Sequence, residues 1–158
     1  MLRRWPLLAF ALVTLLVGCT SFDEQQRKWI FQPIAGQPAW AGARGGDLDE
    51  VWIEHQSAVS GNPVRLHALW LPQARADAPL LLYLHGARRN VWDSSLRIRN
   101  RHQLGFAVLA SDYRGFGSSS DELPSEAAVL EDARAAWDWL ARAYPINLRP
   151  SQSSFFAV

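Results

Sequence analysis

With 158 residues, of which 49% are hydrophobic and 11% aromatic, the chain is long enough to bury the core of one domain, and its composition argues against a wholly disordered polypeptide. Sixteen basic residues stand against 15 acidic ones, so the sequence lacks the strong basic excess that binding to nucleic acid requires. We therefore expect a single globular unit without a nucleic-acid partner.

The N-terminus has the pattern of an export signal. Arg3 and Arg4 precede an apolar run over residues 7–17, in which Thr14 is the only polar residue and which is shorter than the roughly 20 residues that span a bilayer as a helix. The sequence Leu16-Val17-Gly18-Cys19 resembles a bacterial lipobox, in which cleavage leaves the cysteine as the new N-terminus and a diacylglyceryl group on its thiol. Cys19 is the only cysteine, and lipidation would account for a lone cysteine in an exported protein. The alternative is an uncleaved signal anchor with an inert cysteine.

The lipobox also predicts a location. Thr20 follows the cysteine where an aspartate would signal retention, a pattern that resembles default sorting of lipoproteins to the outer membrane. Each buried methylene of an acyl chain contributes about 0.8 kcal/mol, so a multiply acylated protein would not leave the membrane reversibly. We therefore expect a cell-envelope protein, held at the outer membrane and facing the periplasm, with lipidated Cys19 as its membrane contact.

The next elements in chain order are a lead-in and a hairpin. Residues 19–49 show neither a helical nor an alternating period, and we expect a tether and an irregular lead-in there. Strands are predicted over 51–55 and 64–71, because the intervening Ser60-Gly61-Asn62-Pro63 has strong turn chemistry. The alternation along the second strand predicts that His67 faces solvent.

An α/β pattern follows Pro72. Two short apolar runs, "PLLLYLHG" and "FAVLAS", are typical of strands buried on both faces, and residues 94–104 between them favour a crossover helix that ends at Gly105. A longer helix is predicted from an N-cap at Ser125 to Tyr144, before Pro145. Its expected inward stripe consists of Val129, Ala133, Ala136, Trp137 and Leu140.

The serines of "SDYRGFGSSS" do not fit a nucleophile elbow. That turn needs G-x-S-x-G, because side chains two residues on either side of the serine would clash. Gly117 precedes Ser118, Ser119 and Ser120, but Asp121 follows them where the second glycine is required. We therefore expect these serines to serve as turn and cap residues.

Taken together, the segments over 51–145 resemble the first half of an α/β hydrolase. "LYLHGARRN" looks like the third strand and its His-Gly turn, "LASDYRGFGSS" like the fourth strand with a D-x-R-G-x-G-x-S loop, and "EDARAAWDWLARAYP" like the helix before the nucleophile strand. The resemblance is to the serine peptidase, esterase and monoacylglycerol lipase branches. It implies an antiparallel hairpin leading into parallel strands with crossover helices, and hydrolysis of an ester or amide by a serine nucleophile.

The resemblance also implies roles for individual residues. The amide of Ala87 matches one donor of the oxyanion hole, which a rigid strand end would hold in place. The expected scaffold residues around it are His85, Gly86, Asp112, Arg114, Gly115 and Gly117.

The catalytic triad is not expected within this chain. Serine, acid and histidine come after the long helix in the family, and only "INLRPSQSSFFAV" follows it here. Residues 155–158 would begin the nucleophile strand, or the last dozen residues are an out-of-frame tail after a lesion. The interpretation is a signal over 1–18, a lead-in over 19–49 and a partial hydrolase domain over 50–158 that is inactive alone. The rival is a non-catalytic envelope lipoprotein with a binding or structural role.

Other chemistry is sparse. The four histidines and the cysteine lack metal-ligand spacing, so we expect no metal and no cofactor. An incomplete sheet would leave the strand near residues 80–84 poorly paired, which favours self-association. The remaining basic cluster is interpreted as a solvated surface and consists of Arg88, Arg89, Arg97, Arg99, Arg101 and His102.

Overall fold

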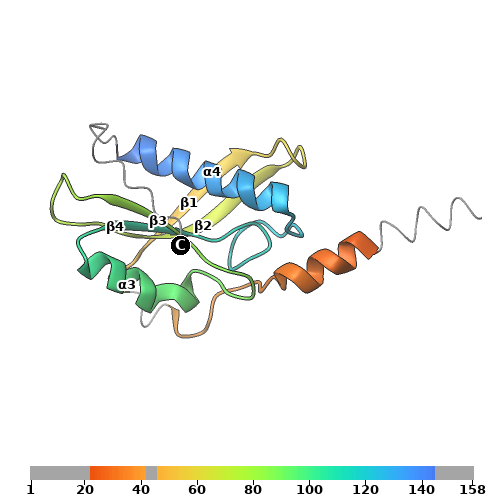
Figure 1. The fold of residues 1–158 in the computed structure, drawn as a ribbon, viewed down its shortest axis with the longest axis horizontal. Helices are drawn as coiled ribbons and strands as arrows, with labels where there is room; N and C mark the ends of the chain where they lie inside the picture. Colours follow the sequence, from red (N-terminus) through yellow and green to blue (C-terminus); the bar gives the residue numbers. More distant parts are fainter. Residues whose placement is uncertain (1–21, 42–45, 145–158) are drawn as a thin grey trace, which may run out of the picture.

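Four strands form one mixed sheet in the order β1-β2-β4-β3 (Figure 1). The structure, a computed structural model, describes residues 22–41 and 46–144. The export signal with Cys19, Pro145 and the C-terminal tail lie outside the described residues.

The predicted hairpin and the predicted parallel crossover are both confirmed. Strand β1 (Asp49–Gln56) pairs antiparallel with β2 (Pro63–Leu71), and β2 pairs antiparallel with β4 (Ala107–Ser111). Strand β3 (Leu80–Leu84) lies parallel to β4. The carboxyl ends of β3 and β4 therefore meet at the same edge of the sheet, which is where the loops with the expected site residues begin.

Two helices cover the two faces of the sheet. A 3₁₀ turn, η1 (Trp92–Ser94), leads into α3 (Ser95–Gln103), which connects β3 to β4. Helix α4 (Glu126–Ala143) lies on the opposite side of the sheet (Figure 1). As expected, Ser125 is its N-cap, and the Ser125 hydroxyl accepts a hydrogen bond from the Ala128 amide at 3.2 Å.

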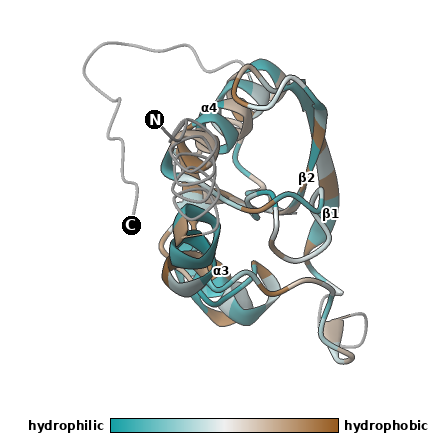
Figure 2. Ribbon diagram, turned by 90° about the vertical axis from the view of Figure 1, so that its right-hand side faces the viewer, coloured by the Kyte–Doolittle hydropathy of each residue, from teal (hydrophilic) through white to brown (hydrophobic). Residues whose placement is uncertain are grey.

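Strand β2 contributes to a hydrophobic core on each face, because alternate residues of a strand point to opposite sides. Leu69 and Leu71 pack with Ile98 and Trp92 on the α3 side. Leu66, Ala68 and Trp70 lie in the cluster with Leu140 on the α4 side. Both hydrophobic and hydrophilic residues occur along β1 and β2 in Figure 2.

The buried stripe of α4 differs from the predicted one. It is a row with i, i+4 spacing, consisting of Ala128, Asp132, Ala136 and Leu140. Val129, Ala133 and Trp137 are only partly buried. The difference arises because the row contains a carboxylate, which a hydrophobic pattern passes over.

The expectation of an irregular lead-in is wrong for residues 22–31, which form a helix. Ion pairs at i, i+4 spacing join Asp23 to Arg27 at 3.9 Å and Glu24 to Lys28 at 2.6 Å. Most of the helix is exposed, so it presents no apolar stripe to the core. No helix within the described residues is long and apolar enough to cross a bilayer.

Candidate functional site

The loops that follow β3 and β4 lie next to each other at one edge of the sheet. The loop after β3 begins with His85-Gly86-Ala87, and the loop after β4 runs from Asp112 to Ser120. Parallel pairing of Leu84 with Ser111 brings the two loops together. This juxtaposition follows from the strand-helix-strand unit that the sequence predicts.

Asp112 holds the two loops to each other. Its side chain is fully buried, and Oδ1 accepts a hydrogen bond from the Val91 amide at 2.8 Å. Oδ2 lies 3.1 Å from Nδ1 of His67 on β2. Burial raises the pKa of Asp112, but interactions with His67 and His85 and the Val91 amide outweigh it, so the pKa lies below its ordinary value. Asp112 is therefore a carboxylate that orders the site.

His85 is packed as part of this scaffold. Its Nδ1 donates to the carbonyl of Gly86 at 2.7 Å, and its Nε2 lies 3.1 Å from Oδ1 of Asp112 outside hydrogen-bond alignment. The ring stacks edge-on against Tyr113 and Phe116, each with centroids 5.0 Å away. Burial raises the pKa of Tyr113 to about 12, so its hydroxyl stays neutral.

The expectation that His67 faces solvent is wrong, because its side chain is fully buried. Nδ1 faces Asp112, and Nε2 lies 3.1 Å from Oε2 of Glu50 on the neighbouring strand. The rings of Trp52 and Trp92 lie against the imidazole, with centroids 5.1 and 6.2 Å away. The imidazole therefore bridges two carboxylates beneath the strand-end loops.

A second buried network is centred on Arg114, whose side chain has no solvent exposure. Its Nε lies 3.0 Å and its Nη2 2.6 Å from Oδ1 of Asp132 on α4. The Arg114 amide also donates to Oδ2 of Asp132 at 2.9 Å. Burial disfavours the cation, but hydrogen bonds to Asp132 and Glu131 raise the pKa of Arg114 above its usual value. The guanidinium therefore fixes the loop after β4 to α4.

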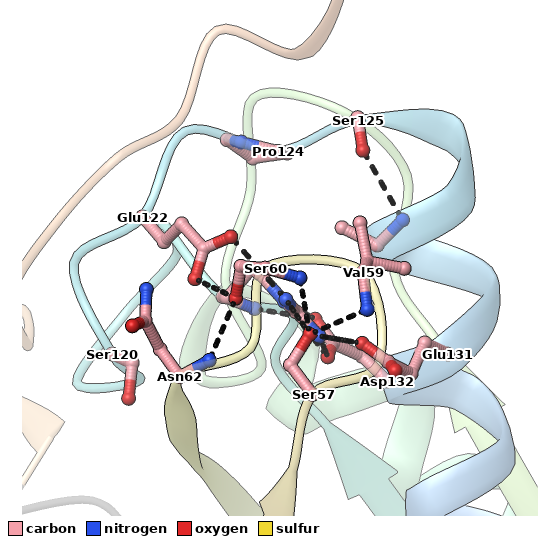
Figure 3. A network of polar contacts seen from close by, with 12 residues as sticks. Ser57, Val59, Ser60, Asn62, Ser120, Glu122, Pro124, Ser125, Glu131 and Asp132 are labelled. Carbon is pink, nitrogen blue, oxygen red and sulfur yellow. Dashed lines mark hydrogen bonds and ion pairs between the residues drawn. The ribbon is translucent and has the colours of Figure 1, made fainter.

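Glu131 extends this network to the β1–β2 turn (Figure 3). It accepts hydrogen bonds from the Ser57 hydroxyl and the Ala58 amide, both at 2.6 Å, and from Arg114 Nη2 at 2.6 Å. Partial burial raises the pKa of Glu131, but these hydrogen bonds outweigh it and lower the pKa to about 2. Glu131 and Asp132 were not expected from the sequence. The signal that could have identified them is an acidic pair about two turns after the N-cap Ser125, in a helix that also contributes to the core.

Ser119 and Ser120 tie the loop after β4 to strand β2. The Ser119 hydroxyl accepts from the His67 amide at 2.9 Å, and the Ser120 hydroxyl accepts from the Arg65 amide at 2.9 Å. Gly117 approaches Asp112 so closely that a Cβ at residue 117 would overlap the carboxylate. A Cβ at Gly115 would lie 2.7 Å from the Glu122 carbonyl oxygen. Both glycines have a positive φ, 80° at Gly115 and 55° at Gly117.

Ala87 lies in the exposed turn after His85. Within the described residues its amide donates no hydrogen bond, whereas the next amide, that of Arg88, donates to the Phe31 carbonyl at 3.2 Å. Arg88 has a positive φ of 66°, a conformation that costs an L-residue energy and that surrounding contacts must maintain. The turn therefore presents an unused backbone donor at the carboxyl end of β3.

The structure places side chains that could ligate a metal only within residues 22–41 and 46–144. No group of three His, Cys, Asp or Glu side chains there is placed to hold an ion. In the basic cluster, Arg99 pairs with Asp47, and His102 Nε2 donates to the Pro72 carbonyl at 2.8 Å.

The chain is similar to longer proteins. No protein-family model matches it. It is 30% identical, over 98% of its length, to an uncharacterized protein of Mycobacterium tuberculosis strain CDC 1551 / Oshkosh, of which it covers 52%. Over 57% of its length it is 33% identical to lysophosphatidylserine lipase ABHD12 of Gallus gallus, of which it covers 24%. The chain thus spans about half the length of the mycobacterial relative and less of the lipase.

The chain also resembles solved structures that are named as hydrolases. An α/β hydrolase from Vibrio vulnificus matches with a TM-score of 0.61 and 19% identity, over 86% of this chain and 46% of that one. The Pyrococcus furiosus esterase Pf2001 matches with a TM-score of 0.53 and 22% identity, over 72% of this chain and 42% of the esterase. At these identities the likeness concerns the fold.

Proposed function

We propose that this chain, which has a partial α/β hydrolase fold, belongs to that superfamily and is part of a serine hydrolase that cleaves an ester or amide bond. The observation that carries the proposal is the unused amide of Ala87 at the carboxyl end of β3. A rigid amide at this place is suited to stabilise the oxyanion that forms when a nucleophile attacks a carbonyl carbon. A lipid substrate is favoured by the relatives named as lysophosphatidylserine lipases.

In this proposal the residues around Ala87 act by positioning. Asp112 accepts a hydrogen bond from the Val91 amide and contacts His67 of strand β2, so it connects the loop after β4 to both. His85 donates to the Gly86 carbonyl beside Ala87. Neither histidine is proposed as the base, because both ring nitrogens of each lie against a carboxylate or a backbone carbonyl and none faces a serine hydroxyl of the described residues. Hydrolysis would proceed through an acyl-enzyme, in which a serine oxygen bonds to the carbonyl carbon and the alcohol or amine leaves with the proton.

The 158-residue sequence contains no G-x-S-x-G, so we propose that it is inactive alone and that a triad would come from sequence outside it. The test is the genomic DNA that follows codon 158, translated in all three frames. A G-x-S-x-G shortly after a strand-like segment supports the hydrolase. Its absence there and in close relatives favours the rival, a non-catalytic envelope lipoprotein that uses the same fold as a binding or structural module.

We also propose that the chain is exported and anchored through a lipid on Cys19, the only cysteine of the sequence. The Cys19→Ala chain should incorporate no radiolabelled palmitate and should accumulate unprocessed. Ser21→Ala, two residues later, is the matched control and should be labelled like the parent chain. Palmitate in the Cys19→Ala protein, or a parent chain that fractionates as soluble, would contradict the anchor.

A further inference from the structure

The helix over residues 22–31 has an apolar face that is largely exposed in the described structure. Phe22, Trp29 and Ile30 are 65, 64 and 56% exposed. At about 100° per residue, their positions fall within roughly one third of the helix circumference. The helix projects away from the sheet (orange in Figure 1), in agreement with the exposure of these three side chains.

The opposite face of the same helix is the one attached to the domain. Arg27 Nε donates to the Pro124 carbonyl at 2.8 Å, and Arg27 Nη2 donates to that of Leu123. Phe31, one turn later, is partly buried, and its carbonyl accepts from the Arg88 amide. The apolar face is therefore directed away from the protein by contacts that fix the rotation of the helix.

The sequence next to this face indicates what covers it. Cys19, the proposed site of lipidation, lies three residues before Phe22. Because so short a segment spans little distance, the helix must stay close to an acyl anchor on this cysteine. Arg88 and Arg89 are exposed in the loop bonded to the end of the helix. Aromatic and aliphatic side chains beside cationic ones are typical of a surface that lies in the headgroup region of an anionic bilayer.

We propose that helix 22–31 docks on the bilayer surface through Phe22, Trp29 and Ile30. The proposal rests on the envelope location given under the proposed function. It assigns an orientation as well as a contact, because Ile34 and Gly36 exchange backbone hydrogen bonds with Gly117 at 2.8 and 2.6 Å. These bonds, together with the one from the Arg88 amide to the Phe31 carbonyl, hold the strand-end loops beside the docked helix.

The test places a photoreactive residue on the full chain in intact cells. p-Benzoylphenylalanine replaces Trp29 in one variant, and Leu96 on α3 or Leu130 on α4 in two matched controls, whose side chains are 69 and 56% exposed. After irradiation, phospholipid adducts are expected at position 29 and not at positions 96 or 130. The same samples are fractionated, which reports on the anchor separately.

Each remaining outcome would overturn the docking proposal. A protein adduct at position 29 would mean that a protein partner covers the face. Equal lipid labelling at all three positions would mean that the helix has no preferred orientation to the membrane. No lipid adduct from a membrane-bound chain would refute docking and leave the anchor intact, whereas no adduct from a soluble chain would refute both.

Discussion

Gly117 lies so close to Asp112 that a Cβ atom at residue 117 would overlap the carboxylate that accepts the Val91 amide. The absence of a side chain at Gly117 is therefore what allows the loop after β4 to close over the buried acid. The same glycine exchanges hydrogen bonds with Ile34 and Gly36 of the N-terminal segment. One residue thus joins the buried scaffold to the segment proposed to face the membrane.

Gly117→Ala should be strongly destabilising, because the methyl group must displace Asp112 from His67 and Val91. Gly61→Ala is the matched control, since Gly61 also has a positive φ, 75°, but has nothing near its missing Cβ. Backbone strain alone should cost about 1–2 kcal/mol at Gly61. Displacing a buried, hydrogen-bonded carboxylate should bring the cost at Gly117 to more than about 3 kcal/mol. Urea unfolding measures both, and equal costs would show that the contact with Asp112 is unimportant.

Asp132→Ala should destabilise the chain by roughly 3–5 kcal/mol, because it leaves the buried Arg114 without its main counter-charge. Asp138→Ala, at an exposed position of the same helix, should change the free energy of unfolding by less than about 0.5 kcal/mol. Denaturant midpoints distinguish the two variants. If the pair contributes as proposed, replacing Arg114 by Met and Asp132 by Leu together should cost less than Asp132→Ala alone.

The sequence predicted the order of the strands and helices better than it predicted which polar residues are buried. The turn at Ser60-Gly61-Asn62-Pro63, the apolar runs and the N-cap at Ser125 depend on local chemistry, and each appears in the structure where expected. His67 could not be placed in this way. The burial of His67 depends on Trp92 and Asp112, which come from later segments of the chain.

The burial of Asp132 on α4 could not be predicted from the sequence for a similar reason. A hydrophobic pattern treats an aspartate as a solvent-facing residue, so the predicted stripe was shifted from the observed row. The buried acid is tolerated because Arg114, from a different element, meets it there, and a single sequence does not reveal such a pairing. Asp112 and Arg114 were expected as scaffold residues only through the resemblance to α/β hydrolases.

The stability of the chain should fall in acid through Glu131. Its folded pKa is about 2 against an ordinary 4.5, so the ionised carboxylate favours the folded state above about pH 4.5. That contribution is lost as the pH falls from about 4.5 towards 2. The pKa of Asp112 is also lowered and adds to the loss in the acid range. Glu131→Gln should be less stable at pH 7 and should show a weaker acid dependence in urea unfolding. Glu126→Gln, exposed in the same helix, should follow the parent curve.

Strand β3 is at an edge of the sheet among the described strands, although its residues are partly or fully buried. An apolar edge with unpaired backbone groups favours pairing with another chain. The 158-residue protein should therefore show a mass that rises with concentration in light scattering coupled to gel filtration. A single monomer mass across a hundredfold range of concentration would contradict this expectation.

The 158-residue chain should show no hydrolase activity, because the described serines and histidines are not arranged for nucleophilic attack. A serine hydroxyl is a weak nucleophile unless a base removes its proton and donors await the oxyanion. Ser119 and Ser120 are engaged as acceptors for β2 amides, and the buried histidines face carboxylates instead of a serine. The purified protein should neither hydrolyse p-nitrophenyl esters above background nor react with a fluorophosphonate probe. An active serine hydrolase of known fold, treated in parallel, controls for the probe. Labelling that disappears in Ser118→Ala would place a nucleophile in this loop and would overturn the proposal that the triad lies outside the 158 residues.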